Sequence, residues 1–324
     1  MRQFLTLPIL VPIVLGIALL ILQPKSRRVR SIYIMAASLA TTALSLACIV
    51  LTYLYGSGFL ACIMVRFNEA FSISLRIDGA SMVYGAIVSV LWPLVTAYSL
   101  DYMSHEGHEN RFFAFWLMAY GVVLGIAYSE DFLTLYFFYE VLTLTTLPLV
   151  MHAMDEKARY AGRKYLVYSL SGAAFAFIGI VFLLNYGVGH LNFTYGGILD
   201  QSLAAGNERT LELVFVAAFF GFGVEAAVFP FHGWLPDASV APTPVSALLH
   251  AVAVVKAGAF AVLRLIYYGF GADFLRGSWA QTVVMTAAIV TIVYGSARAL
   301  RTPHLKRRLA FSTVSNLSYI LFAL

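Results

Sequence analysis

The feature that most constrains this chain is a series of ten long runs that are almost free of charged residues. Each run is close to the roughly 20 residues that a helix needs to cross a bilayer. A transmembrane barrel would instead show alternating segments of about ten residues. We therefore predict an all-α polytopic membrane protein of about ten transmembrane helices, with residues 1–324 forming a single membrane domain. The runs are 4–22, 31–54, 79–100, 112–128, 131–151, 165–185, 211–229, 244–266, 279–297 and 309–324.

The basic residues divide unevenly between the two sets of loops that alternating crossings create. If the first run leads inward and 211–229 is a single crossing, fourteen basic residues lie in inner loops and four in outer loops. This bias follows the positive-inside rule and predicts an N-terminus outside. The net charge of +5 is thus a topology signal, and we expect a lipid bilayer, with no nucleic acid, as partner. The inner residues are Lys25, Arg27, Arg28, Arg30, Arg111, Lys157, Arg159, Arg163, Lys164, Arg298, Arg301, Lys306, Arg307 and Arg308.

The sequence contains no motif typical of cofactor chemistry. Its two cysteines, Cys48 and Cys62, form no CxxC, and neither a GxGxxG after a strand nor a Walker loop occurs. The stretch HEGHE at 105–109 offers two histidines to a metal, but it fits a solvated connection better. We predict no cofactor, no metal site and no catalytic residues, and leave open whether the chain is part of an enzyme.

Two connections between runs carry local structural signals. Residues 55–78 alternate polar and apolar side chains around FSISLRI, a pattern typical of a short hairpin. The turn YSEDF brings Ser129, Glu130 and Asp131 together, and these residues suit the start of a helix.

Ionisable residues occur at depths where a membrane should be dry. Glu140 and Lys256 lie near the middle of their runs, and Glu225 lies in the second half of its run. Such a group costs at least a few kcal/mol, so it marks either a function or a pairing. His250 precedes Lys256 by six residues, about 9 Å along a helix and on a different face, so a water would have to bridge them.

A helix breaker accompanies these charges in GVEAAVFPFHGWLP, residues 223–236. Pro230 has no amide hydrogen, and Pro236, Pro242 and Pro244 extend the irregular backbone. Irregular backbone at membrane depth is tolerated where it lines a watery cavity enclosed by protein. Together with the buried charges, it indicates a path for protons or cations.

Each ionisable residue also has a structural interpretation. Glu140 and Lys256 could neutralise one another as an ion pair that only holds helices together. Glu225 could be protonated and hydrogen-bonded in the interior. His250 alone is as consistent with a core histidine as with a relay.

The block PFHGWLPDASVAPTPVSALLHAVAVVKAGAFAVLRL, residues 230–265, resembles the signature of a known family. It is similar to the antiporter-like subunits of complex I, of Mrp-type sodium/proton antiporters and of energy-converting membrane hydrogenases. Segments 75–82, 137–150, 161–172 and 304–320 follow in the order and spacing of that family.

The resemblance implies a fold of two inverted five-helix repeats, each with a broken helix. Residues 1–110 would be N-terminal helices, and 111–270 the complete first repeat, with its broken helix near 225–236. Residues 279–324 would begin the second repeat, which stays incomplete because the chain ends in its tenth run.

The resemblance also implies roles for individual residues. Proton translocation would involve Glu140, His250 and Lys256, and we place Glu225 on the same path. The turn after Pro230 would support the helix break. The supporting matches are His232, Asp237 and Lys306. Glu225 departs from the pattern, because the family usually has a lysine there that pairs with the glutamate matched by Glu140. Two neighbouring carboxylates would titrate as a coupled pair, which could preserve proton transfer, favour a bound cation or mark lost pumping.

We therefore predict a proton-translocating, or sodium-translocating, antiporter-like subunit of a redox-driven membrane complex. Its partners would be other membrane subunits that perform the redox chemistry, and its location a bacterial or archaeal cell membrane. Two alternatives remain: a stand-alone cation/proton antiporter component, and a structural membrane anchor that has lost pumping.

Overall fold

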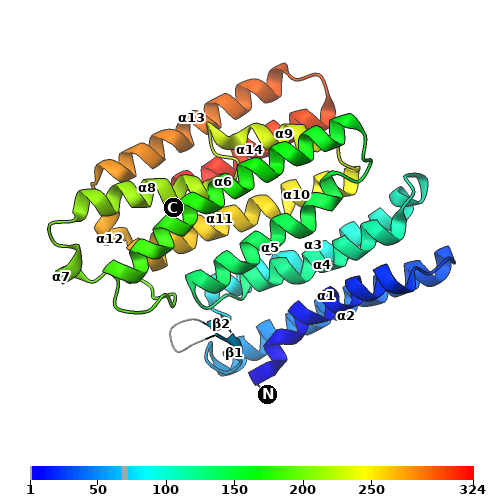
Figure 1. Ribbon diagram of the computed structural model, residues 1–324, viewed down its shortest axis with the longest axis horizontal. Helices are drawn as coiled ribbons and strands as arrows, with labels where there is room; N and C mark the ends of the chain where they lie inside the picture. The colour runs from blue at the N-terminus through cyan, green and yellow to red at the C-terminus, as the bar shows by residue number, and fades with distance from the viewer. Residues whose placement is uncertain (1, 68–71) are drawn as a thin grey trace.

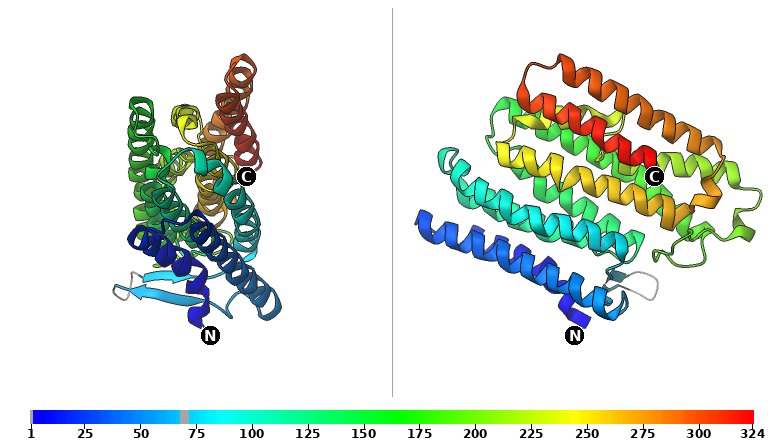
Figure 2. Two further views of the ribbon diagram at one scale, coloured as in Figure 1. Left: turned by 90° about the vertical axis from the view of Figure 1, so that its right-hand side faces the viewer. Right: turned by 180° about the vertical axis from the view of Figure 1, so that it is seen from behind.

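The computed structural model describes residues 2–67 and 72–324, without the side chains of residues 2 and 249–251. Long helices lie roughly side by side, with α1 and α2 at one edge and α13 at the other (Figure 1). Seen from the side, the bundle is more than one helix deep (Figure 2). The first helices are α1 (Leu7–Leu22), α2 (Arg27–Tyr55), α3 (Gly79–Tyr102), α4 (Glu109–Ala127), α5 (Phe132–Val150) and α6 (Glu156–Tyr186). The later ones are α7 (Gln201–Ala204), α8 (Glu208–Gly223), α9 (Trp234–Asp237), α10 (Thr243–Ala251), α11 (Val254–Arg264), α12 (Ala272–Leu275), α13 (Trp279–Arg301) and α14 (Leu305–Ala323).

Seven of the described helical stretches are long and apolar enough to cross a membrane. The chain is therefore an all-α polytopic membrane protein, as predicted. Helices α8, α10 and α11 are shorter, because each of them ends or begins at a break, and α14 carries three basic residues in its first turn. The count of about ten crossings and the division into repeats stay predictions. The seven stretches are Gln3–Leu22, Arg27–Tyr55, Gly79–His105, Glu109–Ala127, Phe132–Val150, Glu156–Tyr186 and Trp279–Arg301.

The connections between helices alternate between two ends of the bundle (Figure 1). One end holds the turns before α2, α4, α6 and α14, at residues 23–26, 103–108, 151–155 and 302–304. We call this the basic end, because the predicted inner basic residues cluster around these turns. The alternation agrees with the loop assignment made from the positive charges.

Aspartate side chains cap four of the described helices, α3, α5, α6 and α7. The Asp131 carboxylate accepts a hydrogen bond from the Thr134 amide at 2.7 Å, and Asp155 accepts one from the Ala158 amide at 2.7 Å. These bonds satisfy backbone donors that have no partner inside the helix. The prediction that YSEDF begins a helix is confirmed for Asp131, which caps α5.

The predicted hairpin is confirmed as an antiparallel pair, β1 (Cys62–Arg66) and β2 (Ser72–Leu75). Its turn, 68–71, lies outside the described residues. The Ser74 hydroxyl donates to the Asp131 carboxylate at 2.5 Å, and the Glu130 amide donates to the Ser74 carbonyl at 3.0 Å. The hairpin is thereby fixed to the turn between α4 and α5.

Helix α11 lies at the centre of the bundle, packed against α4, α5, α8 and α14. Its last residue, Arg264, is fully buried and donates to both carboxylate oxygens of Asp78, at 2.5 and 2.8 Å. The rings of Phe193, Phe260 and Tyr268 lie 4.5–4.9 Å from the guanidinium carbon. A buried charge needs such a partner, so this pair anchors one end of α11.

Candidate functional site

The predicted broken helix is present, with α8 ending at Gly223 and the chain running irregularly to residue 230. The Trp234 indole donates to the Val224 carbonyl at 2.8 Å, and the Phe229 amide donates to the Thr291 hydroxyl at 3.0 Å. Ala227 has a φ of 56°, which is unusual for a residue other than glycine. Side chains from outside the segment therefore replace helical hydrogen bonds that the break removes.

Glu225 lies inside this break and is fully buried. One carboxyl oxygen, Oε1, accepts hydrogen bonds from the Thr143 hydroxyl at 3.1 Å and from the Ser169 hydroxyl at 3.2 Å. The other oxygen, Oε2, has no hydrogen-bond partner within the described part of the chain. A buried polar atom without a partner is costly, so this carboxyl group has spare capacity for a proton, a water or a cation.

The backbone of Glu225 lies directly against α11. A Cβ atom added to Gly258 would come within 2.5 Å of the Ala226 nitrogen and 3.1 Å of the Glu225 Cβ. Only glycine permits this approach. Gly258 follows Lys256 by two residues on α11, so the break packs against the part of α11 that carries this lysine.

Glu140 lies on α5, three residues before Thr143 and so less than one helical turn from the hydroxyl that binds Glu225. Its side chain is half-buried. Within the described residues it forms no ion pair within 4.0 Å, and neither does Lys256. This structure therefore contains no Glu140–Lys256 ion pair, which was the structural alternative for these two residues.

Lys256 follows a second helix break that the sequence analysis did not predict. The run 244–266 is not one continuous helix, because α10 ends at Ala251 and α11 begins at Val254. The Tyr84 hydroxyl, from α3, donates to the Ala253 carbonyl at 3.3 Å. Within the described residues, the predicted broken helix is therefore accompanied by a second interruption, which lies just before the central lysine.

Lys256 and Lys306 line a common cavity of about 360 Å³ between α10, α11 and α14. The Lys306 ammonium group donates to the Ala241 carbonyl at 3.1 Å. The Ser246 hydroxyl also lines the cavity and is buried without a partner in the described part. The walls are mainly apolar, but the polar groups of Lys256, Lys306 and Ser246 offer partners to a water in a space of this size. The remaining lining residues are Thr243, Ala247, Leu309, Thr313 and Asn316.

Pro230 and His232 lie at the end of the irregular segment, where a 3₁₀ turn, Phe231–Gly233, leads into α9. The His232 ring stacks on Phe229 with 5.5 Å between centroids, and it meets Tyr294 of α13 edge-on at 4.8 Å. Its Nδ1 atom is buried and has no hydrogen-bond partner among the described residues. His250 lies in α10, but its side chain is outside the described residues.

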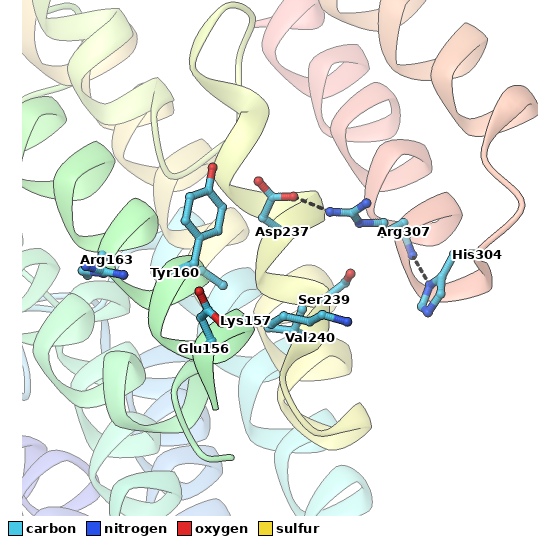
Figure 3. A pocket seen from close by; sticks show the side chains of 10 residues that line it. Glu156, Lys157, Tyr160, Arg163, Asp237, Ser239, Val240, His304 and Arg307 are labelled. Carbon is cyan, nitrogen blue, oxygen red and sulfur yellow. Dashed lines mark hydrogen bonds and ion pairs between the residues drawn. The ribbon is translucent and has the colours of Figure 1, made fainter. Parts of the chain in front are cut away.

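Asp237 joins three elements at the basic end (Figure 3). One carboxylate oxygen pairs with the Lys164 ammonium of α6 at 2.7 Å, and the other pairs with the Arg307 guanidinium of α14 at 2.6 Å. Both oxygens are thus occupied by charges, and the group acts as a clamp between α6, α9 and α14.

Five of the predicted residues therefore fall into two interior groups and one clamp at the basic end, which is Asp237. Glu140 and Glu225 share the neighbourhood of Thr143, whereas Lys256 and Lys306 share the cavity beside α14. Sequence reasoning missed the hydroxyl residues that complete both groups, which are Thr143, Ser169, Tyr84 and Ser246. The hydroxyl-rich stretch LTLTTLP, three of whose residues are threonines, was the available signal for Thr143.

Known proteins resemble this chain in sequence and in fold. Residues 129–324 match the family model described as NADH:quinone oxidoreductase/Mrp antiporter, TM. Residues 67–113 match the model described as NADH-Ubiquinone oxidoreductase (complex I), chain 5 N-terminus.

Among curated proteins, an Na(+)/H(+) antiporter subunit from Alkalihalophilus pseudofirmus is 35% identical over 255 residues. An Na(+)/H(+) antiporter subunit from Staphylococcus aureus is 30% identical over 251 residues. Each match covers 77% of this chain but only 30% of the relative, so the chain spans about 30% of the length of these relatives.

Two solved structures share the fold. A chain of the membrane-bound sulfane sulfur reductase, an archaeal respiratory membrane complex, superposes with a TM-score of 0.83 at 22% identity, covering 99% of this chain and 64% of that one. A chain of the Mrp complex from a Dietzia species gives 0.81 at 24% identity, covering 98% and 34%. The chain belongs to the family of antiporter-like membrane subunits shared by NADH:quinone oxidoreductases and Mrp antiporters.

Proposed function

We propose that the chain carries protons through the membrane by way of Glu140, Glu225 and Lys256. The observation that carries this proposal is the Glu225 carboxyl group, fully buried in a helix break with one oxygen that no described residue hydrogen-bonds. An ionised carboxylate at this depth without a cation is unfavourable by several kcal/mol. Glu225 is therefore expected to hold a proton and to release it only when a positive charge approaches.

The neighbouring groups suit such an exchange. Thr143 and Ser169 donate to the same oxygen, which leaves Oε2 as the atom that takes and gives the proton. Gly258 lets the Glu225 backbone pack against α11, the helix that carries Lys256. The cavity shared with Lys306 and the Ser246 hydroxyl offers water for the next step towards the basic end. His250 keeps the relay role implied by the resemblance, and Pro230, His232 and Asp237 support the break.

The proposal extends to the setting of the chain. Relatives named as Na(+)/H(+) antiporter subunits, and solved neighbours in multisubunit membrane complexes, support other membrane subunits as partners. Bacterial and archaeal relatives support a prokaryotic cell membrane as the location. The excess of basic residues supports an N-terminus outside and a basic end inside. The redox step, where there is one, belongs to the partners.

Proton uptake by vesicles containing the assembled complex tests the proposal. Glu225→Gln keeps an acceptor for Thr143 and Ser169 but cannot exchange a proton, so uptake should fall on the order of a hundredfold. Glu140→Gln and Lys256→Ala should also reduce uptake. Glu208→Gln, at an exposed position at the start of α8, is the matched control and should leave it unchanged.

The outcomes separate the alternatives. Unchanged uptake by Glu225→Gln and Lys256→Ala in an intact complex would leave the structural-anchor interpretation. Uptake that requires sodium on the opposite side would assign sodium as the coupled ion. Uptake by the chain alone, without partners, would favour the stand-alone antiporter component.

A further inference from the structure

A cavity of about 670 Å³ opens at the basic end between α6, α14 and the segment 237–240 (Figure 3). Its charged lining consists of three side chains of α6, Arg307 of α14 and Asp237, with His304 just before α14. The proposed proton path uses none of the α6 residues that line this cavity. Those residues are Glu156, Lys157, Tyr160, Ala161 and Arg163.

The cavity carries more positive than negative charge. Asp237 is already neutralised by Lys164 and Arg307. Lys157 and Arg163 are exposed, and within the described part of the chain neither forms an ion pair. Lys157, Arg163 and Arg307 line the cavity, and Lys164 pairs with Asp237 beside it, so four basic side chains stand against the carboxylates of Glu156 and Asp237. An anion is therefore the ligand that fits.

An apolar groove of about 350 Å³ follows the same helix farther into the membrane. Val167 lines it seven residues after Tyr160, which places the two on one face of α6 and about 10 Å apart along the axis. Phe175 continues the groove, and Phe220 and Phe231 form its other wall. An anion site thus lies at the basic end of α6, and a groove that suits a hydrocarbon chain continues from it into the membrane.

We propose that this face of α6 binds an anionic phospholipid, with its phosphate in the basic cavity and one acyl chain in the groove. Basic pockets between transmembrane helices on the cytoplasmic side are suited to such headgroups. A free phosphate would use the cavity but would gain nothing from the groove, so the combination selects a lipid. The acyl chain would lie against Val224 and Phe231, which flank the first helix break.

Native mass spectrometry of the chain extracted from vesicles tests the charged half of the site. Vesicles of phosphatidylcholine with phosphatidylglycerol should yield a retained phosphatidylglycerol molecule, and pure phosphatidylcholine vesicles should not. The double variant Lys157→Gln/Arg163→Gln should bind about tenfold more weakly, because each basic residue near an anionic surface contributes. Arg209→Gln, an exposed change at the opposite end, is the control and should bind normally.

A second variant tests the groove. Val167→Trp should fill it and reduce phosphatidylglycerol retention, whereas Val293→Trp, on the exposed face of α13, should not. Displacement of the ligand by inorganic phosphate, together with normal binding by Val167→Trp, would assign the cavity to a free anion and overturn the proposal. Equal retention of both phospholipids, or equal binding by the double variant and Arg209→Gln, would overturn it too. Each variant must elute as the parent protein does, which separates loss of binding from loss of folding.

Discussion

The two helix breaks bring a carboxyl group and an amino group into the membrane and arise in different ways. The break at 224–230 ends at Pro230, with Pro236 beyond it, and it carries the carboxyl group of Glu225. The break at 252–253 has no proline or glycine, and it precedes the ammonium group of Lys256. The local sequence therefore explains the first break, whereas the second break depends on contacts with residues that are distant in the sequence.

The comparison teaches that a helix can be interrupted by its surroundings as well as by its sequence. At the second break, Tyr84 of α3 supplies a donor to the Ala253 carbonyl, and its ring stacks on Phe260 at 5.0 Å. At the other end of α11, Arg264 is tied to Asp78. Both anchors come from α3 or from the residue just before it. Substitutions at these two residues should therefore affect the second break and leave the first one intact.

The largest effect is expected at Asp78. Asp78→Asn keeps an oxygen for the Ser81 amide but leaves the fully buried Arg264 charge without a counter-ion. Removing one partner of a buried pair costs about 3 kcal/mol or more in free energy of unfolding. Unfolding in mixed detergent micelles measures it, and hydrogen exchange should rise over 252–264 more than over 224–230.

Asp273→Asn is the matched control. Asp273 pairs with Arg276, and both side chains are exposed, at 92% and 77% respectively. An exposed pair contributes little, so the control should unfold like the parent protein. Equal loss of stability in both variants would remove Arg264 as an anchor of the second break.

A smaller effect is expected for Trp234→Phe, which acts on the first break. The substitution removes one of two donors to the buried Val224 carbonyl, the indole at 2.8 Å, and leaves the Ala227 amide at 3.0 Å, so the expected cost is about 1 kcal/mol. Exchange should increase over 224–230 and stay unchanged over 252–256. Trp279→Phe, at a position 42% exposed, controls for the loss of an indole. Faster exchange at both breaks would show that they open as one unit and would end the distinction between them.

Tyr84→Phe should have a still smaller effect, confined to the second break. The hydrogen bond to Ala253 is long at 3.3 Å, and the ring keeps its stacking on Phe260, so the cost is expected to stay below about 1 kcal/mol. Amide exchange at 252–256 should rise slightly. Tyr98→Phe on the exposed face of the same helix should change nothing. A Tyr84→Phe protein with unaltered exchange would mean that packing alone holds the break.

The same contrast explains what could be predicted from the sequence. The apolar runs, the first break and the place of Glu225 within an apolar run all follow from local composition and from Pro230. The second break could not be predicted, because AVAVVKAG is compatible with an unbroken helix and its partner Tyr84 is 169 residues away from Ala253. The hydroxyls around Glu225 were also beyond reach, since which of many Ser and Thr residues meet depends on how α5, α6 and α8 pack.

The smallest effect concerns pH and arises outside both breaks, so it is the reference against which an acid response at either break is measured. His152, in the turn between α5 and α6, is buried, and burial lowers its pKa from the ordinary value of 6.5, with the Arg111 charge contributing further. The folded protein then binds this proton less readily than the unfolded chain does. The contribution of His152 to stability should therefore be fully present above about pH 6.5 and should decline as the pH falls below it.

His152→Gln should flatten this slope in micelle unfolding. His105 is an exposed histidine of the neighbouring turn, so His105→Gln should keep the slope. Any acid response that survives in His152→Gln and appears as exchange at 224–230 alone then belongs to the break that holds Glu225. Survival of the full slope without such local exchange would contradict the assignment of the slope to His152.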